Sequence, residues 1–258
     1  DPNVDDMGHG TLIAANLFGV APACDFHHVK HDGDVLAGFV LARTLNPHII
    51  TCSWGFPDSV VYDVLTNYPS TGEADYYRNV RNEIQAALAA GTTVLFSSGN
   101  LVNPPNGPHW PSGEPGVISV GGAFIDKKFR LSASSFASSF TSLVTGKSCP
   151  DVCGLVGPAP VGLLFPLPTQ PGSIFDQGNS PHDKTLGNDG WCVTSGTSGA
   201  APQLAGMAAL LMQLHGGQTP PQILAHFQEM AVGVHTGKTA TGHRATKARP
   251  NRATGWGL

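Results

Sequence analysis

The chain has 258 residues, of which 41% are hydrophobic and 12% are charged, so it can bury the core of one α/β domain and is not a disordered chain. Its formal net charge of −4 gives no basic surface for nucleic acid, and no apolar run reaches the length of a membrane span. These features exclude nucleic acid and a bilayer as the expected partners.

The N-terminal residues lead into the motif Gly-His-Gly-Thr at residues 8–11. The chain opens with Asp1-Pro2-Asn3 and has neither an initiator Met nor a signal peptide, so we expect a processed form or a fragment, and no compartment is predicted. His9 stands between two glycines at the expected start of a helix. Its imidazole is therefore expected to be fixed by the backbone and able to take a proton near neutral pH.

Helices and short apolar strands alternate along the first half of the chain. Hydrophobic periodicity predicts helices over residues 34–45 and 76–90. Buried strands are predicted to follow them at 47–54 and 92–97, and a third strand is predicted at 117–120. This alternation predicts an α/β fold with a mostly parallel sheet and right-handed crossovers.

Two of these strands end in short polar motifs. Residues 53–55 read SWG, and residues 97–100 read SSGN. In parallel sheets the chemistry gathers at the carboxyl ends of the strands. Both motifs are therefore candidates for a functional site.

The second half of the chain has a different amino-acid composition. Residues 147–190 are rich in proline and glycine, and we predict that they form a surface insertion within a single domain spanning residues 1–258. The basic tail at 237–252 is predicted to be a solvated segment. Among the five cysteines, Cys149 and Cys153 could form a local disulfide, whereas their spacing and the scattered histidines argue against a structural zinc site.

The segment 194–206 reads TSGTSGAAPQLAG and runs into an apolar helix pattern. Small residues allow a sharp turn and a close approach of other groups. The residues that recur at the spacing of one buried helix face are Ala201, Leu204, Met207, Ala208 and Leu211. Ser198 is thereby placed at a helix N-terminus, where unpaired N–H groups and a positive field stabilise negative charge. A Ser- and Thr-rich cap on a core helix is the alternative interpretation.

Three motifs taken together resemble one protein family. GHGT at 8–11, SSGN at 97–100 and GTSGAAP at 196–202 follow the order His, Asn, Ser that is typical of the subtilisin-like serine peptidases, the subtilase family. Weaker matches, such as CSWG at 52–55 and GWG at 255–257, extend the resemblance over nearly the whole chain. The resemblance implies a mostly parallel β-sheet flanked by helices on both faces.

The resemblance also implies a catalytic role for three residues. Ser198 would be the nucleophile that attacks a peptide carbonyl, forming an acyl-enzyme, and His9 would serve first as general base and then as general acid. The Asn100 side chain and the Ser198 backbone N–H would form the oxyanion hole. The implied activity is that of a serine endopeptidase.

The same resemblance implies where the substrate binds. Ser53, Trp54 and Gly55 resemble the edge on which the family pairs an extended polypeptide substrate. Trp54 would form a wall of the pocket for the residue before the scissile bond. The alternative interpretation is that Trp54 is an ordinary tryptophan of the core or its rim. We expect a monomer without a cofactor, and no acidic cluster matches a calcium-binding loop.

One member of the family's triad is missing. The family's catalytic Asp precedes its His on a separate strand, and only eight residues precede His9. Asp5 and Asp6 match the loop before the family's His better than that strand, so neither is assigned. We expect that the chain lacks an N-terminal segment carrying the Asp, that its end at Gly257-Leu258 is also clipped, and that this chain is nearly inactive.

Three alternatives remain open at this stage. Sedolisin peptidases share the SGTSxxxP pattern of residues 195–202, but they use a Glu base and an oxyanion-hole Asp, and they favour acidic pH. An α/β-hydrolase esterase would need a Gly-x-Ser-x-Gly elbow with its His after the Ser. A pseudoenzyme that binds extended peptides on the 53–55 edge without cleaving them is the third.

Overall fold

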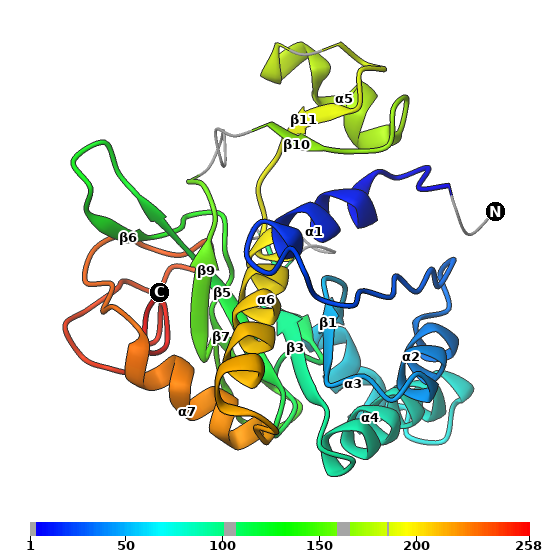
Figure 1. The fold of residues 1–258 in the computed structure, drawn as a ribbon. Coiled ribbons are helices and arrows are strands. Elements are labelled where there is room, and N and C mark those ends of the chain that lie inside the picture. The colour runs from blue at the N-terminus through cyan, green and yellow to red at the C-terminus, as the bar shows by residue number, and fades with distance from the viewer. Residues whose placement is uncertain (1–3, 101–106, 159–165, 185) are drawn as a thin grey trace.

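The computed structural model describes residues 4–100, 107–158, 166–184 and 186–258. Its centre is a five-stranded sheet, formed by β1 (Ile49–Cys52), β3 (Thr93–Ser97), β5 (Ile118–Ile125), β6 (Leu131–Ala133) and β9 (Val152–Leu155). The pairs β1/β3, β3/β5 and β5/β9 are parallel, and β5/β6 is antiparallel. The predicted α/β fold with a mostly parallel sheet is confirmed (Figure 1).

The remaining elements of the described ranges are helices and three small antiparallel pairs of strands. The helices are α1 (His9–Phe18), α2 (Val35–Thr44), α3 (Asp58–Asn67), α4 (Gly72–Ala89), α5 (Ile174–Asp183), α6 (Thr197–His215) and α7 (Pro220–Met230). The small pairs are β2 (Phe56–Pro57) with β4 (His109–Trp110), β7 (Phe140–Thr141) with β8 (Ser148–Cys149), and β10 (Pro166–Pro168) with β11 (Trp191–Val193). None of the helices in the described ranges is long and apolar enough to cross a membrane.

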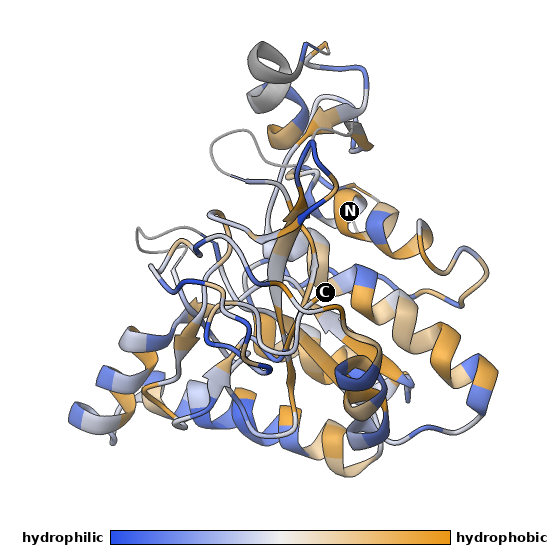
Figure 2. Cartoon of the chain, turned by 90° about the vertical axis from the view of Figure 1, so that its left-hand side faces the viewer, coloured by the Kyte–Doolittle hydropathy of each residue, from blue (hydrophilic) through white to orange (hydrophobic). Residues whose placement is uncertain are grey.

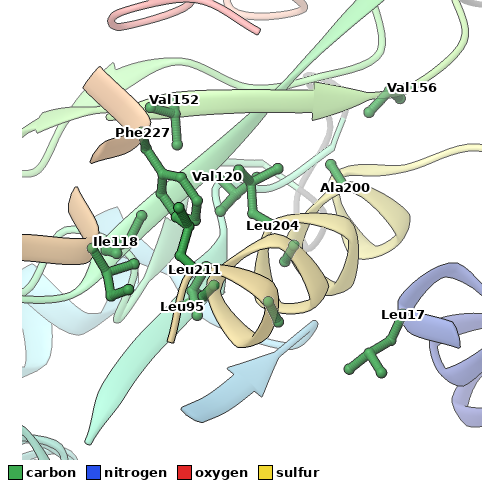
Figure 3. Close-up of a cluster of buried hydrophobic side chains, with 14 residues drawn as sticks. Leu17, Leu95, Ile118, Val120, Val152, Val156, Ala200, Leu204, Leu211 and Phe227 are labelled. Atoms are coloured by element: carbon green, nitrogen blue, oxygen red, sulfur yellow. The ribbon is translucent and has the colours of Figure 1, made fainter. Parts of the chain in front are cut away.

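Helices cover both faces of the sheet because the strands alternate their buried side chains. In β3, Leu95 packs against α6 and α7, whereas Val94 and Phe96 pack against α2, α3 and α4. Figure 3 shows the first of these layers, in which Leu204 and Leu211 of α6 lie among the side chains of the strands. In Figure 2 the helices around the sheet carry both hydrophobic and hydrophilic residues, as expected for elements with one buried face.

The sequence itself sets the limits of the helices. Thr71 caps α4, since its hydroxyl accepts the Ala74 N–H at 3.3 Å, and this cap starts the helix earlier than the predicted residue 76. On α6, Met207 was predicted on the buried face but is 38% exposed, while the other four predicted residues are buried. The predicted face was therefore too wide by one residue.

The prediction that the proline- and glycine-rich region 147–190 is a surface insertion needs correction. The region is not only a surface insertion, because β9 lies inside it and pairs with β5 from Val120↔Val152 to Ala123↔Leu155. Cys153 in β9 is buried, and α5 forms near the end of the region. A strand of four residues buried on a parallel neighbour has no periodicity of its own to detect.

Candidate active site

His9 is the first residue of α1, and the loop before it is fixed by Asp5. The two carboxylate oxygens of Asp5 accept the Gly8 N–H at 3.0 Å and the Thr11 N–H at 2.7 Å, and the Thr11 hydroxyl adds a further bond at 2.8 Å. Asp5 thereby satisfies the free N–H groups at the start of α1. Both of its oxygens are therefore engaged by Gly8 and Thr11.

The imidazole of His9 is partly buried. Within the described ranges it makes no hydrogen bond, either as donor or as acceptor. Burial lowers its pKa from the ordinary value, and the negative charge of Asp5 opposes that shift. Its ring lies 5.6 Å from the ring of Phe175, at 37°. His9 is therefore held neutral at neutral pH, as a general base requires.

Ser198 is the second residue of α6 and contacts the end of β1. The Ser198 hydroxyl points to the Ser53 carbonyl oxygen at 3.5 Å, and the Ser53 hydroxyl donates to the Ser198 carbonyl at 2.8 Å. These contacts tie the start of α6 to the strand end that the sequence singled out. The positive end of the helix lies next to the Ser198 hydroxyl.

Asn100 follows β3 in the chain and is held by Thr197. The Asn100 Oδ1 atom accepts the Thr197 N–H at 2.7 Å and the Thr197 hydroxyl at 3.0 Å. The same hydroxyl accepts the Gly99 N–H at 3.2 Å, and Thr197 is fully buried. Gly99 has φ +107°, and a Cβ there would lie 2.1 Å from the Gly107 carbonyl oxygen, so only glycine fits before Asn100.

One small cavity brings the three predicted catalytic residues together. His9, Asn100 and Ser198 all line a cavity of about 100 Å³, which also receives Phe175 and Leu167 from a distant part of the chain. No hydrogen bond joins His9 and Ser198 within the described ranges, and such bonds are commonly loose before substrate binds. Sequence reasoning did not find Thr197, Leu167 or Phe175 as parts of the site.

The predicted substrate edge at 53–55 contacts Ser198 through Ser53. Trp54 packs edge-on against Phe96, with ring centroids 4.9 Å apart, and is partly buried. Trp54 and Ser53 line a second, larger cavity of about 760 Å³. At Gly55 a Cβ would lie 2.6 Å from the His109 Cβ, so this position admits no side chain. Trp54 is thus both a rim residue of the core and part of a cavity wall.

The larger cavity lies along the free edge of the central sheet. In the described part of the sheet, β1 pairs with β3 on one side only. The cavity is lined by Ile50 and Cys52 of β1, by residues 24–33, and by His9 at the start of α1. The sequence predicted a pocket wall at Trp54, but it did not predict the wall formed by residues 24–33.

Cys149 and Cys153 do not form the disulfide that their spacing allowed, since both side chains are free thiols. Burial raises the pKa of Cys149 to about 11, which keeps this thiol protonated and unreactive near neutral pH. No group of three or more His, Cys, Asp or Glu side chains in the described ranges is arranged to hold a metal ion.

Comparison with protein families gives one match that covers the chain. The sequence model described as the subtilase family matches residues 1–257. None of the curated protein sequences compared with this chain matches it. The family match includes all three motifs that carry His9, Asn100 and Ser198.

Solved structures with the same fold are peptidases of low sequence identity. A lanthipeptide protease is 20% identical with a TM-score of 0.68, over 98% of this chain and 73% of that one. Sphericase is 17% identical with a TM-score of 0.63, over 99% of this chain and 78% of that one. A Pseudomonas sedolisin, described as a serine-carboxyl proteinase, is 17% identical with a TM-score of 0.63, over 97% and 75%.

Proposed function

This chain belongs to the subtilase family, and from that premise we propose that it is a serine endopeptidase that cleaves extended polypeptides through an acyl-enzyme. The observation that carries the proposal is the shared cavity. His9, Asn100 and Ser198 come from three distant segments and line the same cavity of about 100 Å³ at the N-terminus of α6. A nucleophile, a base and an amide donor at one helix N-terminus are the parts that acyl transfer needs.

In the proposed reaction Ser198 attacks the carbonyl carbon of the scissile bond. Its hydroxyl turns from the Ser53 carbonyl, 3.5 Å away, toward the imidazole of His9, which takes the proton. His9 then gives this proton to the leaving amine. The lowered pKa of His9 keeps the base neutral and ready at neutral pH.

Negative charge on the tetrahedral intermediate is stabilised by two donors. Because the Oδ1 atom of Asn100 is occupied by Thr197, the Nδ2 group of the same amide is the end left to donate. The Ser198 backbone N–H is the second donor. Both act at the positive end of α6, where they need no reorganisation as charge develops.

The missing part is a carboxylate that orients His9. Among the described residues no carboxylate hydrogen-bonds to His9, and Asp5 is engaged by Gly8 and Thr11. Making the triad Asp of a serine peptidase neutral lowers kcat by about 10⁴-fold, so we propose that residues 1–258 alone turn over slowly. We propose that the working enzyme takes this carboxylate from a further segment of the same protein.

The test is covalent labelling with a fluorophosphonate probe at pH 8. It compares residues 1–258 with the protein translated from the start of its gene, and it includes Ser198→Ala and, as a matched control, the exposed Ser59→Ala. We expect labelling at Ser198 in the longer protein, loss of labelling only in Ser198→Ala, and slow labelling of the shorter chain. Folded proteins that never label would refute the peptidase.

A peptide-binding pseudoenzyme is the second candidate, because His9 lacks a carboxylate partner in the described ranges. It would bind extended peptides beside residues 53–55 and leave them intact. Peptide binding measured by calorimetry, together with the absence of labelling, would favour it. A sedolisin-type enzyme would instead place an acidic residue where Asn100 stands, and its activity would peak at acidic pH.

A further inference from the structure

A small unit of the chain, here called the arm, stands apart from the central sheet. The arm comprises residues 166–193, in which β10 and β11 pair and α5 lies between them. In Figure 1 it lies at the top of the molecule, above α1. Its two strands form a sheet of their own, and β10 packs against α1.

Backbone hydrogen bonds fix the arm to the loop before His9. The Ile174 and Phe175 N–H groups donate to the carbonyl oxygens of Asp6 and Met7, each at 3.0 Å. The Thr169 hydroxyl donates to the Gly8 carbonyl, also at 3.0 Å. Three successive residues before His9 are thus bound to the arm.

This attachment brings two apolar side chains of the arm to the catalytic cavity. Phe175 lies against the ring of His9, and Leu167 lines the same cavity as Ser198. Leu155, at the end of β9, also lines it. Among the described residues that line this cavity, His9 alone carries an ionisable side chain.

The geometry also tells which part of a substrate the cavity faces. His9 delivers its proton to the leaving amine, so the leaving residue lies on the His9 side of Ser198. His9 lines both cavities, whereas Ser198 lines only the small one. The 53–55 edge touches Ser198 through Ser53, and its residues Ser53 and Trp54 line the larger cavity. The cavity therefore faces the residue that follows the scissile bond.

We propose that the arm selects an aliphatic side chain at the residue after the scissile bond, and that Phe175 is the residue that sets this preference. The inference rests on the proposed peptidase function. A cavity of about 150 Å³ holds one benzene ring, so a cavity of about 100 Å³ suits a branched aliphatic side chain better than an aromatic one. A charged side chain would lose its hydration against Leu155, Leu167 and Phe175 without gaining a partner.

The test measures kcat/KM on peptides that differ only in the residue after the scissile bond, which is Leu, Phe, Asp or Lys. It uses the form of the protein that labels with the fluorophosphonate probe. The wild type is expected to cleave the Leu peptide at least about tenfold faster than the other three. Phe175→Ala enlarges the cavity and should raise the Phe-to-Leu ratio by about tenfold, whereas Phe175→Trp should lower cleavage of both peptides.

Two controls separate the possible failures. Leu186→Ala lies in the same arm, at a side chain that is 68% exposed, and should leave all ratios unchanged. Fluorophosphonate labelling at pH 8 involves no residue after a scissile bond, so Phe175→Ala should still label at Ser198, although its contact with His9 allows the labelling rate to change. Normal labelling with an unchanged Phe-to-Leu ratio would overturn the role of the arm, as would loss of labelling in Phe175→Ala. A wild type that does not label would refute the proposed peptidase itself.

Discussion

Thr197 is expected to position the oxyanion hole without touching substrate. Its buried hydroxyl lies between the Gly99 N–H, at 3.2 Å, and the Asn100 Oδ1, at 3.0 Å. Thr197→Val keeps the shape of the side chain and the backbone N–H bond to Asn100, but removes the hydroxyl. The substitution therefore frees one of two anchors of the Asn100 amide and leaves the Gly99 N–H without its partner.

Both consequences have a calculable size. A buried N–H left unsatisfied costs about 1–3 kcal/mol, so we expect the free energy of unfolding to fall by about 2 kcal/mol. Losing the whole oxyanion-hole amide in a peptidase of this family costs about 10²- to 10³-fold in kcat. Losing one of its two supporting hydrogen bonds, worth about 0.5–1.5 kcal/mol, should lower kcat by about twofold to thirteenfold and leave KM unchanged.

Initial rates on a chromogenic peptide and urea unfolding measure the two effects separately. Thr197→Ser restores the hydroxyl and should recover kcat. Thr66→Val, at an exposed position of α3, is the matched control and should change neither quantity. A Thr197→Val enzyme with wild-type kcat, or with a change in KM alone, would refute the idea that Thr197 positions Asn100.

Three further predictions concern pH and packing. Burial lowers the pKa of His109 to about 4, so neutral His109 stabilises the fold above pH 6.5 and this stabilisation is lost as the pH falls toward 4. In urea titrations the free energy of unfolding should fall by about 3 kcal/mol over this range, and His109→Leu should abolish that fall. An equal fall in the variant would contradict the assignment to His109. Because the charge of Asp5 raises the pKa of His9, Asp5→Asn should lower that pKa and move the acidic limb of kcat/KM to lower pH; a limb that moves upward would exclude this coupling. At Gly154 a Cβ would lie 2.8 Å from the Ala200 carbonyl oxygen, so Gly154→Ala should lower the free energy of unfolding in urea by about 2 kcal/mol. At Gly72 a Cβ would meet no atom, so Gly72→Ala should lower it by less than about 1 kcal/mol, and equal losses would argue against the close approach at Gly154.

Local signals in the sequence predicted several elements of the first half of the fold, although they missed α3 at Asp58–Asn67. The strand predicted at 92–97 is β3 at Thr93–Ser97, and the helix predicted at 34–45 is α2 at Val35–Thr44. Each of these elements has its own period or a run of buried apolar residues. β9 was missed because its strand character comes from pairing with β5, about thirty residues earlier in the chain, and no local pattern records that pairing.

The residues of the candidate site also fall into two groups, those that local sequence motifs predicted and those that only the fold brings to the site. His9, Asn100 and Ser198 stand in glycine-rich motifs whose local conformation is encoded by the residues beside them, and the structure brings all three to one cavity. Phe175 and Leu167 reach that cavity only because the arm binds the loop before His9. Nothing in the sequence around Phe175 distinguishes it from an ordinary surface phenylalanine.

The structure also bears on the plainest alternative for Ser198, a Ser- and Thr-rich cap on a core helix. The N-cap of α6 is Gly196, and no side chain makes a capping hydrogen bond there. Instead, the Thr197 hydroxyl serves Gly99 and Asn100 after β3, and the Ser195 hydroxyl accepts the Gly157 N–H beyond β9. The hydroxyls of this segment thus join α6 to the ends of separate strands, which fixes the position of Ser198 relative to the sheet. A helix cap needs no such connections, whereas a nucleophile that must meet a base and an amide donor from other segments does.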